Sequence, residues 1–304
     1  MTARVLVIGR QGQLARELAR AQWPAGWTVT FTGRPELDLR FPDKAAAAVV
    51  AAAADIVVNA AAYTNVEQAE SEPELARSIN AAGPAAIAAA CKTIGAPFVT
   101  ISTDYVFDGK KQSPYLEDDP VNPISAYGRG KAEGEALVRG ALPEHVILRT
   151  SWMFSPFGTN FVRTMMRLGG ERPALRVVAD QRGCPTGAGD LARAIVTVCN
   201  AIKSGQGRFG TYHAANAGAT TWYDFASAIF QMLAARGERV PEIVPITTAE
   251  YPTKAARPAN SLLDCARLRD TFAITLRPWR EALADCVSEL ARQPSVGIRT
   301  GGVS

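Results

Sequence analysis

The chain has 304 residues, enough for one large or two ordinary domains with a sizeable buried core. Hydrophobic residues make up 47% and charged residues 20%, which is ordinary for a soluble globular protein, and the formal net charge is +4. Because this charge is small and no basic run stands out, nucleic acid is not expected as a partner. A local basic pocket for an anionic small molecule remains compatible with it.

The cysteines are far apart, odd in number and without C-x-x-C spacing, which predicts reduced thiols in a cytoplasmic protein rather than disulfides or a zinc site. They are Cys91, Cys184, Cys199, Cys265 and Cys286. The apolar run in "MTARVLVIGR" is too short for a signal peptide. Only the alanine-rich stretch 45–54 comes near an uninterrupted apolar span, and we interpret it as a buried crossover helix, so no membrane partner is expected.

Strands and helices alternate through the first half of the chain. Short β-branched and apolar runs predict strands at 4–9, 27–33, 55–62, 97–107 and 145–154. Helices are predicted at 12–22, over the alanine-rich stretch, within 72–95 and from near Ala126 onward. This order predicts right-handed βαβ units and therefore an α/β fold, a Rossmann-like doubly wound parallel sheet. Ligands of such sheets bind beyond the carboxyl ends of the strands.

The alternation becomes irregular after about residue 155. Amphipathic helices are predicted at 220–237, with Thr220 or Thr221 near the cap, and at 277–290, whereas 242–264 is rich in Pro and Thr and predicts an ordered loop. The last residues, 293–304, are expected to form a mobile tail. We expect a dinucleotide-binding domain from 1–150 plus roughly 176–205. A smaller C-terminal α/β substrate-binding domain is expected from roughly 151–175 and 206–292.

The first strand and helix carry a candidate phosphate loop. In "VLVIGRQGQLA", Gly9 and Gly12 separate the strand from the helix, and Ala15 stands where a third glycine often lies. Glycines allow a tight turn and close approach of a pyrophosphate, which the amides at the helix N-terminus can hold. The spacing G-x-x-G-x-x-A departs from the commoner G-x-G-x-x-G, but its position between strand and helix favours a dinucleotide site.

The end of the second strand bears on the choice of cofactor. An acidic residue there accepts from the ribose 2′-OH of NAD, and a basic residue suits the 2′-phosphate of NADP. The strand ends in Gly33 and Arg34, which predicts NADPH. Glu36 and Asp38 follow closely, so NADH remains the alternative.

A phenol and an ammonium lie four residues apart in "SAYGRGKAE", as Tyr127 and Lys131. On a helix this spacing places both on one face, where the ammonium would lower the phenol pKa toward neutrality and allow proton transfer. The preceding strand ends in "ISTDYVFDG", which supplies Thr103 and Asp104. A hydroxyl, a tyrosine and a lysine at the carboxyl edge of the sheet, beside a dinucleotide site, suggest a reductase.

This constellation resembles the short-chain dehydrogenase/reductase superfamily, and the chain looks like its extended branch. The resemblance is closest to the dTDP-4-dehydrorhamnose reductase family and covers nearly all of residues 4–290. The segments that carry it, in order, are "GRQGQLA", "VNAAAYTNVEQAE", "STDYVFDG", "AYGRGKAEGE", "LRTSWMF", "NFVRTMMRL", "DQRGCPTGAGDLA", "TTWYDFA" and "EYPTKAARPANSLLD". "STDYVF" is more widespread among nucleotide-sugar enzymes, whereas "PTGAGDLA" with "RPANSLLD" is more specific to this family.

The resemblance implies reduction of the C4 ketone of dTDP-4-dehydro-L-rhamnose by NADPH, with Tyr127 as proton donor. Lys131 would hold the tyrosine pKa down and grip the nicotinamide ribose, Thr103 would bond the carbonyl oxygen, and Asp104 would orient the sugar or relay a proton. The remaining cofactor candidates lie along the pyrophosphate, at the adenosine end or over the sheet. They are Gly9, Gln11, Gly12, Gln13, Leu14, Arg34, Asp38, Leu39, Ala60, Ala61, Ala62 and Tyr63.

Three further residues are candidates for the nucleotide sugar. Trp152 would flank the sugar, and Arg257 with Asn260 would hold the diphosphate. Some family members join dimers through magnesium, but Gly189 stands where one carboxylate ligand is expected, so we predict no metal. The expected state is a monomer or a homodimer.

Two other interpretations stay open. Another nucleotide-sugar epimerase, dehydratase or ketoreductase would share this architecture, although "STDYVF" lacks the extra acidic residue that elimination requires. The chain also resembles the non-catalytic regulatory subunit of methionine adenosyltransferase, which acts by contacting an enzyme.

Overall fold

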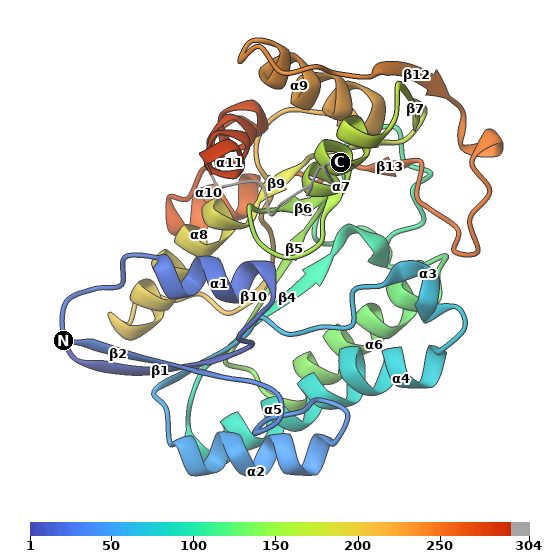
Figure 1. The fold of residues 1–304 in the computed structure, drawn as a ribbon. Helices are drawn as coiled ribbons and strands as arrows, with labels where there is room; N and C mark the ends of the chain where they lie inside the picture. The colour runs from blue at the N-terminus through green and yellow to red at the C-terminus, as the bar shows by residue number, and fades with distance from the viewer. Residues whose placement is uncertain (293–304) are drawn as a thin grey trace, which may run out of the picture.

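A six-stranded parallel sheet forms the centre of the computed structural model, which describes residues 1–292 (Figure 1). The expected tail at 293–304 lies outside the described residues. In spatial order the strands are β10 (Gly210–His213), β5 (His145–Thr150), β4 (Phe98–Thr103), β3 (Ile56–Asn59), β1 (Ala3–Ile8) and β2 (Trp27–Thr32). The predicted doubly wound α/β fold is confirmed.

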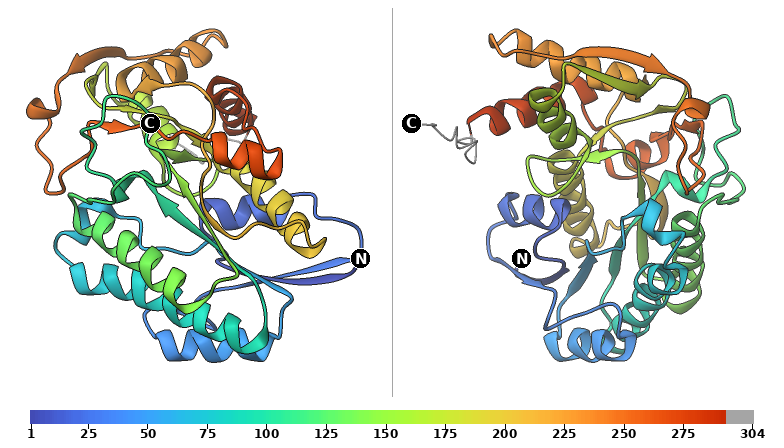
Figure 2. Two further views of the ribbon diagram at one scale, coloured as in Figure 1. Left: turned by 180° about the vertical axis from the view of Figure 1, so that it is seen from behind. Right: turned by 45° about the vertical axis from the view of Figure 1, so that its right-hand side comes forward.

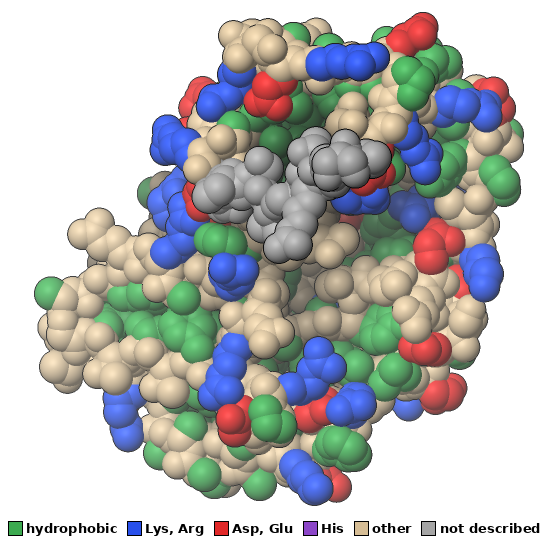
Figure 3. All heavy atoms as spheres, viewed as in Figure 1, with side chains coloured by type: hydrophobic (Ala, Val, Ile, Leu, Met, Phe, Trp, Pro, Cys, Tyr) green, Lys and Arg blue, Asp and Glu red, His purple; other side chains and the backbone are tan. Residues whose placement is uncertain are grey.

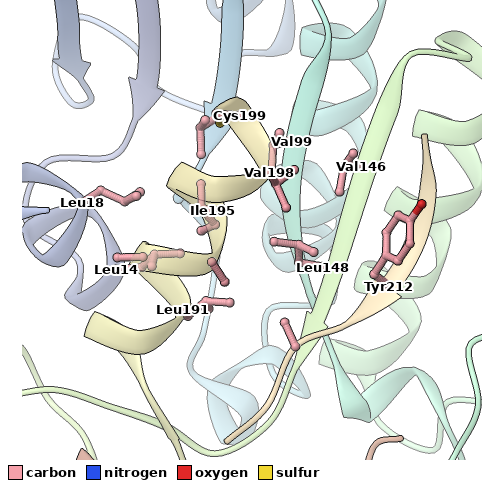
Figure 4. Close-up of a cluster of buried hydrophobic side chains, with 14 of the residues drawn as sticks. Leu14, Leu18, Val99, Val146, Leu148, Leu191, Ile195, Val198, Cys199 and Tyr212 are labelled. Atoms are coloured by element: carbon pink, nitrogen blue, oxygen red, sulfur yellow. The ribbon is translucent and has the colours of Figure 1, made fainter. Parts of the chain in front are cut away.

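Each face of this sheet is covered by helices because side chains along the strands alternate between two cores. Val5 and Val7 of β1 face one core, and Leu6 and Ile8 face the other. The first core receives α1 (Gln13–Arg20), α8 (Ala188–Lys203) and α10 (Ala266–Phe272); Figure 4 shows Leu191, Ile195 and Val198 of α8 directed at β4 and β5. The second core receives α2 (Pro42–Ala52), α5 (Gly83–Ile94) and α6 (Ala126–Ala141).

The crossover helices differ in detail from their predicted form. Among the residues of the alanine-rich α2, only Ala45 and Val49 are buried, so the expectation of a buried helix is wrong: its opposite face meets solvent. The region 72–95 forms one helical run in which α4 (Pro73–Arg77) passes into the π-helical turn η1 (Ser78–Ala82) and then α5. The short helix α3 (Val66–Ala69) precedes it.

A smaller α/β unit lies beyond the carboxyl ends of the central strands (Figure 2). Its helices α7 (Phe161–Glu171), α9 (Trp222–Ala234) and α11 (Trp279–Arg292) share a third core. Its strands form three small sheets: β7 (Ala174–Val178) with β12 (Glu242–Ile246); β8 (Arg182–Gly183) between β11 (Thr220–Thr221) and β13 (Asn260–Ser261); and β6 (Met153–Phe154) with β9 (Thr186–Gly187). Among the helices of residues 1–292, none is long and apolar enough to cross a membrane.

Three predicted boundaries are corrected by tertiary structure. The strand expected at 97–107 ends at Thr103, whose hydroxyl accepts from the Tyr105 amide and caps the 3-10 turn η2 (Asp104–Val106). The strand expected at 145–154 divides into β5 and β6, because Trp152 takes a left-handed backbone (φ 48°). The loop expected at 242–264 contains β12, the 3-10 turn η3 (Thr248–Glu250) and β13, since β7 and β8 offer pairing partners.

Two segments pair with a different sheet from the one that the expected domain boundaries assign to them. Residues 174–178 pair with β12 in the smaller unit, whereas 210–213 pair with β5 in the central sheet. Leu268 and Phe272 of α10 pack in the first core beside Tyr212. The proposed segments 176–205 and 206–292 therefore do not follow sheet membership.

Candidate active site

Tyr127 enters the site because the start of α6 is fixed from three sides. The Ser125 hydroxyl caps the helix by accepting from the Gly128 amide at 3.1 Å, and the Glu70 carboxylate accepts from the Ala126 amide at 2.7 Å. A Cβ on Gly128 would overlap the Tyr105 carbonyl oxygen, so glycine permits the helix to dock on η2. This docking brings Tyr127 to the carboxyl end of β4.

Thr103 and Asp104 form a bonded pair at that strand end. The Thr103 hydroxyl donates to Asp104 Oδ1 at 3.0 Å, while Asp104 Oδ2 is buried without a partner among the described residues. Asp104 is only 2% exposed, and burial raises the pKa of its carboxyl to about 7. Near neutral pH this group therefore takes up or releases a proton readily.

The tyrosine and the lysine share one helix face, as their spacing predicts, but the expected lowering of the tyrosine pKa is not seen. Surrounding protein withholds water from Tyr127 and raises its pKa above the ordinary value of 10, although Thr103 acts in the opposite direction. Lys131 donates to the Ile101 carbonyl oxygen at 2.6 Å. Burial lowers the pKa of Lys131 to about 8, against the raising effect of Glu135 one turn further along α6. In this structure, then, both Tyr127 and Lys131 favour their uncharged forms more strongly than they do in water.

The turn between β1 and α1 has the form that a pyrophosphate requires. Gly9 is buried with φ +130°, and a Cβ there would lie 3.2 Å from that of Ala15 and 3.4 Å from the Ala60 backbone. The N-cap residue of α1 is Gly12, so no side chain bonds to the first amides of the helix. The first turn of α1 also carries no acidic residue that would repel an anion. The first amides of α1 can thus receive an anion, and the residues fit a dinucleotide. Gln11 and Gly12 are exposed, Gln13 is half-buried, and Leu14 packs in the first core.

The predicted adenosine end carries more cations than anions. Arg34 is exposed, and the Glu36 carboxylate is engaged by Arg10 at 2.7 Å. Asp38 is held by Arg40, which lowers the pKa of the Asp38 carboxyl. The Leu39 side chain is buried in the second core and would lie 3.1 Å from a Cβ on Gly83, so any cofactor contact from Leu39 would be through its backbone.

Three residues with small side chains follow the end of β3: Ala60, Ala61 and Ala62. Tyr63 comes next. The Tyr63 amide donates to Asn80 Oδ1 and the Tyr63 carbonyl accepts from Asn80 Nδ2, both at 2.9 Å. Asn80 is 2% exposed and lies in η1. Asn80 is not among the predicted residues; a single Asn inside an alanine-rich helical run is the signal that points to it.

The three predicted substrate residues have different surroundings. Trp152 stacks on Trp222, with ring centroids 3.6 Å apart. Arg257 pairs with Glu67 across to α3 at 2.8 Å. The Asn260 side-chain nitrogen donates to the carbonyls of Lys111 and Ser113 and its oxygen accepts from the Leu262 amide, so this side chain joins loops, and its contact with a diphosphate stays a prediction. Trp222 and Glu67 were also missed, although both lie inside the motifs quoted above.

Acidic side chains near Gly189 are paired with arginines. Asp190 accepts from Asn216 and Arg277, and also pairs with Arg193. Glu17 and Glu289 both pair with Arg20. Within residues 1–292, no three His, Cys, Asp or Glu side chains are grouped so that they could hold a metal.

Comparison with known proteins agrees with this arrangement. The family model described as the RmlD substrate binding domain matches residues 3–292. A dTDP-4-dehydrorhamnose reductase of Sinorhizobium fredii is 44% identical over 92% of this chain and 95% of its own. A crystal structure of dTDP-4-dehydrorhamnose reductase from Bacillus anthracis in complex with NADP has a TM-score of 0.87 and 36% identity, covering 95% of this chain and 100% of that one.

The chain belongs to the dTDP-4-dehydrorhamnose reductase family. The resemblance inferred from the motifs is thereby confirmed, and with it the assignment to NADP-dependent oxidoreductases. A further relative, from Streptomyces antibioticus, is named as a probable dTDP-4,6-dihydroxy-2-methyloxan-3-one 4-ketoreductase and is 41% identical over 98% of this chain and 99% of its own. On the face drawn in Figure 3, Lys and Arg side chains are spread over both the upper and the lower half of the molecule.

Proposed function

We propose that this chain reduces the C4 ketone of dTDP-4-dehydro-L-rhamnose to dTDP-L-rhamnose with NADPH, and that Tyr127 is the proton donor. Similarity to reductases of that name over nearly the whole chain supports the substrate. The observation that carries the mechanism is the meeting of Thr103, Asp104 and Tyr127 at the carboxyl end of β4.

The β1–α1 turn would hold the cofactor pyrophosphate, with Gly9 and Gly12 giving access to the first amides of α1. Arg34, which is exposed, and Arg10, if Glu36 releases it, would bind the 2′-phosphate, which favours NADPH over NADH. NADPH, when bound, supplies the hydride.

Tyr127 is suited to proton donation because its raised pKa keeps the phenol protonated at neutral pH. Thr103 can donate a second hydrogen bond to the oxygen that gains charge at C4. Lys131, which is still mostly protonated at pH 7 with its pKa of about 8, would stabilise the phenolate that forms. Asp104 can return a proton to this site through Thr103, since its own pKa is about 7.

On the substrate side, the Trp152 ring would flank the sugar and the Arg257 guanidinium would bond the diphosphate. A different dTDP-linked C4-keto sugar is the second candidate substrate, because the Streptomyces antibioticus relative is about as similar as the rhamnose reductases. We further propose a cytoplasmic enzyme that needs no protein partner for turnover.

NADPH oxidation at 340 nm with dTDP-4-dehydro-L-rhamnose tests the proposal, comparing wild type with Tyr127→Phe. Loss of the proton donor should reduce kcat by about 100-fold or more while NADPH binding persists. Tyr212→Phe is the matched control, since it removes the hydroxyl of another buried tyrosine, which donates to the Arg208 carbonyl. A wild type that binds NADPH without turnover of either sugar, or full activity in Tyr127→Phe, would contradict it.

A further inference from the structure

The segment 254–260, which we call the strap, connects the smaller unit to the catalytic edge of the central sheet. Its Pro258 packs on Gly109, which has φ +75° and where any Cβ would lie 2.6 Å from Pro258. The backbone N–H of Asn260 donates to the Gly109 carbonyl at 3.1 Å. The C-terminal end of the strap is thus fixed to the loop that follows β4 and η2.

The N-terminal end of the strap is fixed by one carboxylate. Glu67 of α3 accepts from the Lys254 amide at 2.9 Å and from the Ala255 amide at 3.5 Å, and its other oxygen accepts from Arg257 Nη2 at 2.8 Å. Burial raises the pKa of Glu67, but these donors outweigh it and lower the pKa overall. The carboxylate is therefore ionised at neutral pH and holds backbone and side chain together.

Arg257 is held beside the catalytic residues with hydrogen-bonding capacity to spare. Its side chain is 27% exposed, and its Nε is buried without a hydrogen-bond partner among the described residues. Burial raises the pKa of the Tyr105 phenol, and the nearby Arg257 guanidinium opposes this effect. The Tyr105 ring in turn meets the Tyr127 ring edge-on, with centroids 5.6 Å apart. A buried guanidinium N–H without an acceptor is costly, so a ligand oxygen is the natural partner.

We propose that Glu67 is a positioning residue for the nucleotide sugar: it sets the strap so that the free N–H groups of Arg257 face the ligand diphosphate. This rests on the proposed function, which assigns Arg257 to that diphosphate. Glu67 occupies one end of the guanidinium and fixes its plane, which leaves the other N–H groups for two phosphate oxygens. Because Glu67 is on α3 of the central unit, it also ties the substrate loop to the cofactor side.

The test compares Glu67→Ala and Glu67→Gln with wild type, using calorimetric binding of dTDP and steady-state kinetics. Glu67→Ala should raise the Kd of dTDP and the KM of the nucleotide sugar about tenfold, and leave kcat within about threefold, because three bonds to the strap are lost and none of them is made to Thr103, Tyr127 or Lys131. Glu67→Gln keeps an accepting oxygen and should recover part of this loss, which a requirement for bulk alone would not explain. Glu74→Ala, at an exposed position of the neighbouring α4, is the control and should match wild type.

The outcomes separate the two proposals. If wild type does not bind dTDP, the nucleotide assignment fails and the role of Glu67 with it. If wild type binds dTDP and both Glu67 variants bind it equally well, only the role of Glu67 is overturned. In Arg257→Ala, adding Glu67→Ala should cause little further loss, because the residue that Glu67 positions is already absent; fully additive losses would contradict the mechanism.

Discussion

Asp104 should make this protein less stable as the pH rises, and Asp104→Asn should remove that dependence. The carboxyl is 2% exposed, and burial raises its pKa from 3.8 to about 7. A group whose folded pKa is raised binds more protons in the folded than in the unfolded state between those values, so the free energy of unfolding falls as the pH rises through that window.

The size of the effect follows from the width of the window. Two pH units, from 5 to 7, lie inside it, and at about 1.4 kcal/mol per unit they correspond to about 3 kcal/mol. The amide that Asp104→Asn introduces carries no charge to bury, so the stability of this variant relative to wild type should rise by up to about 3 kcal/mol between pH 5 and pH 8.

Urea unfolding at pH 5, 6, 7 and 8 measures this difference. Asp108→Asn is the control: the Lys110 amide and the Tyr115 phenol lower the pKa of Asp108, so it is ionised in both states throughout this range. Its stability difference from wild type should be constant with pH. An Asp104→Asn difference that is equally constant would refute a buried carboxyl that titrates near 7.

Three other predictions follow from named contacts. Wild-type kcat should fall as the pH rises through about 8, where Lys131 loses its proton, and Lys131→Met should have low kcat without that alkaline limb in a pH–rate profile. Gly134→Ala should lower the free energy of unfolding by about 1–3 kcal/mol, because its Cβ would overlap the Asn80 carbonyl oxygen; Gly140→Ala, on the open face of the same helix, should raise it by up to about 1 kcal/mol in the same urea assay. Arg34→Glu should raise the Kd of NADPH by about tenfold or more and change that of NADH little, as measured by fluorescence titration.

The sequence predicted the parts of the site that depend on local pattern. The turn at Gly9 and Gly12 follows from a strand, a glycine-rich turn and a helix in succession, and Tyr127 and Lys131 share a face because four residues make about one helical turn. It could not predict the protonation behaviour. The pKa of Tyr127 depends on how much water the folded chain excludes, and the Lys131 ammonium bonds to Ile101, a residue thirty positions away in the sequence.

The distant pairings show the same limit. The sequence suggested a ligand contact for Asn260 but did not show that its side-chain nitrogen donates to the carbonyls of Lys111 and Ser113, because those residues lie about 150 positions away in the sequence. Glu67 and Arg257 are 190 positions apart, and only folding makes them partners.

By itself, then, the sequence determined the fold class, the phosphate turn and the identity of the candidate catalytic side chains, because periodicity, turn chemistry and helical spacing act over a few residues. Tertiary structure alone decided where Thr103 ends its strand, how Asp104 is buried and which charged groups meet, because burial and long-range pairing arise only when distant segments pack.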